Sequence, residues 1–153
     1  MQESNQTPRL TPGAKVVAAV AAIGCLAVLI VAAILKPSPT GITTHGGLGL
    51  PPCGWEASTG VPCMTCGMTT SFAWAVRGNL IASLWVQPFG TLLCLLCAMT
   101  FWAGLYAAAT GNPIQRFLSV LRLRTYLIGV TAMCLVAWAW KVYIHNRGMD
   151  GWP

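Results

Sequence analysis

Three long apolar segments set the pattern of this chain, and they cover about residues 16–35, 89–110 and 125–144. A helix rises about 1.5 Å per residue, so about 20 residues cross the roughly 30 Å hydrocarbon layer of a bilayer. Lys36 and Pro37 follow the first segment directly. A cleaved secretory signal has a shorter apolar core and a small-residue cleavage site. The pattern therefore predicts an all-α integral membrane bundle with three full spans.

Residues 64–87 are also apolar, but Arg77-Gly78-Asn79 interrupts them. One continuous span would place Arg77 in mid-membrane, at a cost of about 2.5–3.5 kcal/mol. Gly78 is a plausible helix cap, and Asn79 is a plausible N-cap for the segment 80–86. We therefore expect a broken helical hairpin whose two ends lie on one side of the membrane.

The remaining segments are polar or rich in helix breakers. Residues 1–15 are expected to form a disordered tail, and residues 16–153 a single membrane domain. Residues 36–62 contain five prolines and six glycines, which predicts a loop rather than a helix. The cysteine-containing loop of this domain accordingly runs over residues 36–63.

Composition and charge support the membrane class. Hydrophobic residues make up 56% of the chain and charged residues only 8%, against about 25% in soluble domains. The net charge of +6 comes from cations that flank apolar segments rather than cluster with aromatic residues, which argues against nucleic acid as a partner. The expected partner is the lipid bilayer, with a membrane protein or a second copy of the chain as further possibilities.

The distribution of positive charge predicts the orientation. With three spans and Arg77 left out, five cations fall on the side of the N-terminus and three on the other side. The N-terminal side carries Arg9, Lys15, Arg116, Arg122 and Arg124. The opposite side carries Lys36, Lys141 and Arg147. The positive-inside rule then makes the N-terminus cytoplasmic, and the cysteine loop and C-terminus extracytoplasmic. Trp138, Trp140 and Tyr143 read as an interfacial aromatic belt, beside which Lys141 can snorkel to the headgroups.

The candidate chemistry lies between Cys53 and Ser71. Cys63-Met64-Thr65-Cys66 stands at the entrance of an expected helix, where unpaired backbone N–H groups favour a thiolate. Cys53 lies ten residues earlier on a Gly- and Pro-containing segment that can fold back, so we expect the three sulfur atoms to converge. A structural disulfide, a metal site and a redox-active pair all remain open.

Two metals suit these residues. Zinc would take Cys53, Cys63 and Cys66 with His45 as a fourth ligand. Copper(I) would take Cys63 and Cys66 with Met64 or Met68 nearby. Glu56 and Arg77 are the central acid and base, and they either pair across the hairpin or each face water.

The other cysteines and the absence of known catalytic motifs limit the possible chemistry further. Cys94 and Cys97 share one face of the second span, and like Cys25 and Cys134 they read as small packing groups. The sequence holds no Ser-His-Asp set, phosphate loop or dinucleotide fingerprint. No catalytic residue is assigned, and a non-enzymatic protein is favoured.

The segment Thr59-Gly60-Val61-Pro62-Cys63-Met64-Thr65-Cys66-Gly67-Met68-Thr69-Thr70, followed by Arg77-Gly78-Asn79 and Gln87-Pro88, resembles an uncharacterised bacterial membrane family. That family is known as a domain of unknown function, with a signature close to T-G-x-P-C-x-x-C-G-[ML]-T-[RT]. The resemblance covers about residues 53–100. It implies a multi-span protein of a bacterial inner membrane and no established reaction.

Two functions compete. In the first, the chain handles a metal or thiols through Cys53, Cys63 and Cys66. In the second, it is an accessory subunit whose cysteines form a structural disulfide and whose helices pack against a larger complex. A small-residue face such as Ala18/Ala22 suits helix packing in either case.

Overall fold

The computed structural model describes residues 10–51, 53–112 and 123–152. These residues form helices and no strand, in the order α1 (Pro12–Ile34), the 3-10 helix η1 (Thr44–Leu48), α2 (Gly54–Thr59), α3 (Met68–Ala75), α4 (Leu80–Val86), α5 (Pro88–Thr110) and α6 (Leu123–Asn146). Three helices, α1, α5 and α6, are long and apolar enough to cross a membrane. The predicted all-α bundle with three spans is confirmed.

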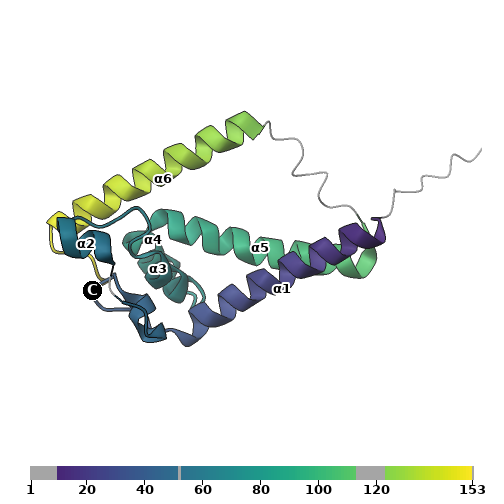
Figure 1. Ribbon diagram of the computed structural model, residues 1–153, viewed down its shortest axis with the longest axis horizontal. Coiled ribbons are helices and arrows are strands. Elements are labelled where there is room, and N and C mark those ends of the chain that lie inside the picture. The colour runs from purple at the N-terminus through teal and green to yellow at the C-terminus, as the bar shows by residue number, and fades with distance from the viewer. Residues whose placement is uncertain (1–9, 52, 113–122, 153) are drawn as a thin grey trace, which may run out of the picture.

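The short helices gather at one end of the molecule (Figure 1). The C-terminal end of α1, the N-terminal end of α5 and the C-terminal end of α6 meet there, close to the C-terminus of the chain. The N-terminal end of α1 and the C-terminal end of α5 lie together at the opposite end. The cysteine loop and the C-terminal tail therefore share one face of the protein.

Helices α1 and α5 pack closely because small residues meet at their contact. Ala18 and Ala22 are buried on α1, and Gly104 of α5 lies against them. A Cβ atom at Gly104 would come within 2.8 Å of the Ala18 carbonyl oxygen. Close backbone approach of this kind is the usual way in which membrane helices associate.

Helices α3 and α4 form the expected broken hairpin. Gly78 adopts a φ of +82°, and the Asn79 side chain accepts a hydrogen bond from the Ala82 N–H at 3.0 Å. The eight residues of α3 span only about 12 Å, too short to cross a bilayer. Arg77 therefore stays at the same end as the cysteines, where its guanidinium donates to the Ala32 and Ala33 carbonyls at the end of α1.

A buried hydroxyl cluster joins this hairpin to α5. It consists of Ser71, Ser83 and Thr91, whose side-chain oxygens lie 2.7–3.1 Å from one another. The Ser83 hydroxyl also donates to the Ser71 carbonyl at 2.8 Å. Each of these three hydroxyls therefore has partners inside the protein, so their burial leaves no hydroxyl of the cluster unpaired.

Several helix boundaries differ from those expected from the sequence. Helix α1 begins at Pro12, inside the expected tail, because Thr11 caps it by accepting from the Ala14 N–H. Residues 54–59 form the helix α2 within the expected loop, between the N-cap Cys53 and a left-handed Gly60. Helix α3 begins at Met68 rather than Met64, because the cysteine pair occupies a separate turn.

Lys141 corrects a further expectation. Its side chain is fully buried instead of reaching toward headgroups. The ammonium forms a 3.0 Å ion pair with Asp150 of the C-terminal tail and lies 3.5 Å from the Gly41 carbonyl. His145, one helical turn on, contacts the other Asp150 oxygen at 2.6 Å. This ion cluster, Lys141, His145 and Asp150, ties the tail to the loop that follows α1.

Part of the charge pattern falls outside the described residues. This applies to the N-terminal residues 1–9 with Arg9, and to residues 113–122 with Arg116 and Arg122. Arg124 lies in the first turn of α6.

Candidate functional site

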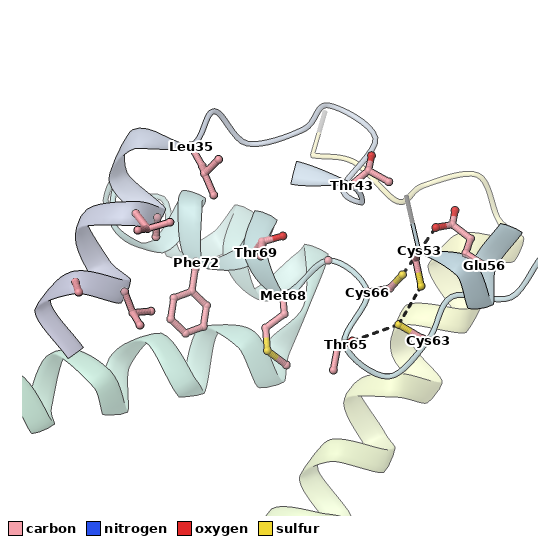
Figure 2. Close-up of a pocket in the computed structure, with 15 residues that line it drawn as sticks. Leu35, Thr43, Cys53, Glu56, Cys63, Thr65, Cys66, Met68, Thr69 and Phe72 are labelled. Atoms are coloured by element: carbon pink, nitrogen blue, oxygen red, sulfur yellow. Dashed lines mark hydrogen bonds between the residues drawn. The ribbon is translucent and has the colours of Figure 1, made fainter. Parts of the chain in front are cut away.

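Three cysteines from two segments meet at the end where the short helices gather. Cys53 is the N-cap of α2, while Cys63 and Cys66 lie in the turn before α3. Their three sulfur atoms lie within 4.8 Å of one another, and those of Cys53 and Cys63 are 3.6 Å apart. Figure 2 shows the three side chains directed toward one another. The expected convergence of the thiol cluster, Cys53, Cys63 and Cys66, is confirmed.

The turn between Cys63 and Cys66 is held from two sides. Gln87, fully buried at the junction of α4 and α5, donates from Nε2 to the Met64 carbonyl at 3.0 Å. Trp138 of α6 donates from Nε1 to the Pro62 carbonyl at 3.0 Å. Distant helices thus fix the backbone on which the thiols stand.

Gly67 closes the turn with a φ of +83°. A Cβ atom there would lie 2.9 Å from the Gly41 carbonyl oxygen and 3.2 Å from a Val86 methyl group. Both the left-handed backbone and the lack of space require glycine directly after Cys66.

The two cysteines of the turn differ in acidity. Burial raises the pKa of Cys63, but hydrogen bonds from the hydroxyl and backbone of Thr65 and from Cys53 and Cys66 outweigh it, so the pKa is lowered. Burial and, to a smaller extent, the charge on Cys63 raise the pKa of Cys66 to about 12, although a hydrogen bond from the Cys63 backbone acts in the opposite direction. Cys63 is therefore the first of the two to become a thiolate.

Glu56 adds a carboxylate to the cluster. Its Oε2 atom lies 3.9 Å from the Cys66 sulfur, on the side of the trio formed by α2 (Figure 2). Among the described residues the ion pairs are those of Asp150 with Lys141 and His145, so Glu56 has no cationic partner there. Arg77 contacts carbonyl groups at the end of α1, so the Glu56–Arg77 pair considered from the sequence does not form.

The weaker candidates lie around the cluster. Met68 lines the cavity beside the cysteines, whereas the Met64 side chain is exposed. The backbone of His45 lies in η1, and its side chain is outside the described part of the chain. Cys97 contacts the Cys25 carbonyl across the α1–α5 interface at 3.6 Å, which fits a packing role for these two residues.

A cavity of about 690 Å³ adjoins the thiol cluster. One wall comes from the last turns of α1 and another from α3, with Met68 and Phe72 projecting between them (Figure 2). Cys53, Glu56, Cys63 and Cys66 form the polar end. The thiols therefore border an apolar space as well as the protein surface.

Gln87, Trp138 and Thr65 were not identified as site residues from the sequence. Gln87 and Trp138 act across long sequence separations that only the fold reveals. Thr65 carried a local signal, because a hydroxyl placed between two cysteines can bond to a neighbouring sulfur, as it does to Cys63 at 3.3 Å.

Fold and site together define a multi-pass helical membrane protein with a convergent trio of thiols at one end of the bundle. Residues 53–101, which include the trio, the hairpin and the first half of α5, match the family described as Protein of unknown function (DUF2752). Comparison with curated proteins and with solved structures finds no match.

Proposed function

We propose that the thiol cluster binds one zinc ion, with Cys53, Cys63 and Cys66 as sulfur ligands and Glu56 as the oxygen ligand. The protein would thus be a metal-handling membrane protein without an assigned catalytic residue. Three sulfurs and one carboxylate are a donor set that suits tetrahedral zinc.

The spacing of the sulfur atoms carries this proposal. Zinc–sulfur bonds of about 2.3 Å at tetrahedral angles place two sulfurs roughly 3.8 Å apart. The Cys53 and Cys63 sulfurs are 3.6 Å apart, whereas a disulfide bond is about 2.05 Å long. Glu56 approaches Cys66 at 3.9 Å, close to the separation of a sulfur and an oxygen on one metal.

The charge of the site supports the same proposal. A thiolate at Cys63 and the carboxylate of Glu56 would bring negative charges together with no described cation paired to either. Buried or half-buried charges are retained where they are paired or where they coordinate a metal. A divalent ion would supply the missing positive charge.

Elemental analysis of the protein in lipid nanodiscs, purified under reducing conditions, tests the proposal. We expect about one zinc per chain in the wild type. Changing Cys53, Cys63 or Cys66 to serine should each lower the zinc content several-fold, because each change removes one ligand. Copper in place of zinc would identify a copper(I) site formed by the sulfur trio.

Cys134→Ser is the matched control, since Cys134 is a half-buried thiol on α6 outside the cluster. It should leave the zinc content unchanged. Loss of zinc in this variant as well, or metal-free wild-type protein, would contradict the proposal.

The second candidate is an accessory subunit in which Cys53 and Cys63 form a structural disulfide. Their 3.6 Å separation favours it too, because a small side-chain rotation would bring the sulfurs to bonding distance. Mass spectrometry of non-reduced peptides distinguishes the two functions: an invariant Cys53–Cys63 crosslink in metal-free protein supports the subunit.

The orientation belongs to the same proposal. The five-to-three distribution of cations supports a cytoplasmic N-terminus, and the resemblance described above supports a bacterial inner membrane with the thiol cluster on its outer face. Impermeant labels should reach cysteines introduced at positions 46 and 118 from opposite sides. Labelling of both from one side would reverse this orientation.

A further inference from the structure

The cavity beside the thiol cluster contains far more apolar surface than a bound zinc ion would need. Its walls carry aliphatic and aromatic side chains from two helices, Ala27, Val28, Val31, Ala32 and Leu35 of α1 with Met68 and Phe72 of α3. A volume of about 690 Å³ lies in the range of small-molecule sites, roughly 300–1,000 Å³. Apolar cavities bind apolar ligands in preference to water.

The cavity opens on the side of the bundle. Ala27, Val28 and Val31 line it and are also exposed on the surface of α1. This helix is one of the three that can cross the membrane, so its exposed face lies against hydrocarbon. A ligand can therefore enter from the bilayer, chain first.

The two ends of the cavity call for different chemistry in the ligand. The α1–α3 end accepts a hydrocarbon chain. The other end is lined by Thr43 and Thr65 together with the thiols and Glu56. No lysine, arginine or histidine lines the cavity within the described residues. With zinc bound, three thiolates and a carboxylate would still exceed the charge of the ion, so a phosphate headgroup would meet a negatively charged site.

We propose that this cavity binds one chain-bearing amphiphile with an uncharged headgroup, such as a monoacylglycerol, which places its chain between α1 and α3 and its headgroup beside the thiol cluster. The apolar walls that would hold the chain lie outside the zinc donor set, so binding of the chain does not require zinc. The cavity would thus bring a ligand from the membrane next to the thiol cluster.

Photo-crosslinking in nanodiscs tests this proposal. The probe is a monoacylglycerol with a photoreactive diazirine near the end of its chain, and crosslinked peptides are identified by mass spectrometry. We expect saturable labelling of residues 27–35 and 68–72, displaced by monodecanoylglycerol. Decyl phosphate, of the same chain length, should need at least about tenfold higher concentration, a difference of about 1.4 kcal/mol.

Two variants of α1 sharpen the test. Ala27→Phe fills the mouth of the cavity and should reduce labelling several-fold. Ala21→Phe adds the same bulk on the exposed surface of α1 outside the cavity and should leave labelling unchanged. Removal of zinc from the wild type with a chelator should leave the chain labelling unchanged, whereas Ala27→Phe should reduce labelling and keep zinc. Failure of the zinc proposal and failure of the lipid proposal are therefore visible separately.

Labelling spread evenly along α1, absence of displacement, or equal displacement by decyl phosphate would overturn the proposal. The wild-type competition decides this even if Ala27→Phe fails to fold.

Discussion

The hydroxyl cluster and the thiol cluster lie at the same end of the molecule, but only the thiol cluster brings ionisable groups together without a described cation. Ser71, Ser83 and Thr91 are fully or almost fully buried and bond to one another and to nearby carbonyls. The thiol cluster and Glu56 have no described cation beside them. Neutral hydroxyls that bond to one another need no further partner, whereas negative charges that gather without a cation favour the binding of a metal ion.

The ion cluster resembles the hydroxyl cluster, because its polar groups are paired within the protein. Lys141 is buried, yet its charge is matched by Asp150, which also contacts His145. All three clusters are polar and lie at the end of the molecule where the short helices gather, so polarity alone does not mark a functional site. The distinction would fail if the thiol cluster proved stable and metal-free. Substitutions made in each cluster separately test it.

The largest expected effect is in the ion cluster. Lys141→Met should lower the free energy of unfolding by about 3–5 kcal/mol, because it leaves Asp150 without its buried ammonium partner. Unfolding in detergent, followed by circular dichroism, measures this loss. Lys36→Met, at an exposed lysine, should change stability by no more than about 0.5 kcal/mol, and an equal loss in both variants would remove the special role of Lys141.

A smaller effect concerns thiol reactivity in metal-free protein. At neutral pH, Cys63 has the larger thiolate fraction because its pKa is lowered while that of Cys66 is raised to about 12. After allowance for the weaker nucleophilicity of an acidic thiolate, Cys63 should react with iodoacetamide at least about 30-fold faster. Peptide mass spectrometry over time measures both rates, and faster reaction at Cys66 would reverse the assignment.

Gln87→Met should weaken zinc binding by about tenfold, because the Met64 carbonyl loses the donor that orients the cysteine turn. Competition with a zinc-binding dye measures the affinity. The same titration on Trp138→Phe, which removes the donor to Pro62, should give a loss of similar size. Unchanged zinc affinity in both variants would show that the cysteine turn does not need these two hydrogen bonds.

The smallest expected effect is in the hydroxyl cluster. Ser83→Ala should cost about 1 kcal/mol of unfolding free energy, since Ser71 and Thr91 each lose one partner and keep others. Zinc content should not change. A fall in zinc without a fall in stability would mean that the two clusters are coupled, contrary to the distinction drawn above.

The sequence predicted the helices well because their signals are local. Asn79 caps α4, Gly78 separates the two short helices, and the long apolar segments became α1, α5 and α6. The convergence of Cys53 with Cys63 and Cys66 was also predictable, because the Gly- and Pro-containing segment between Cys53 and Cys63 is long enough to fold back.

The rest depended on contacts between distant residues. Lys141 was expected at the headgroups, because nothing local shows that Asp150 folds back upon it. The i,i+4 spacing of Lys141 and His145, with one acid in the following tail, was the available signal. Gln87 gave none, because its partner Met64 lies 23 residues away.

The most direct test of the account is the X-ray absorption spectrum of zinc bound to the protein in nanodiscs. The account predicts a first shell of three sulfurs at about 2.3 Å and one oxygen at about 2.0 Å. Cys66→Ser should convert this shell to fewer sulfurs, or abolish zinc binding. A shell made only of oxygen and nitrogen, or metal-free protein with a Cys53–Cys63 disulfide, would contradict it.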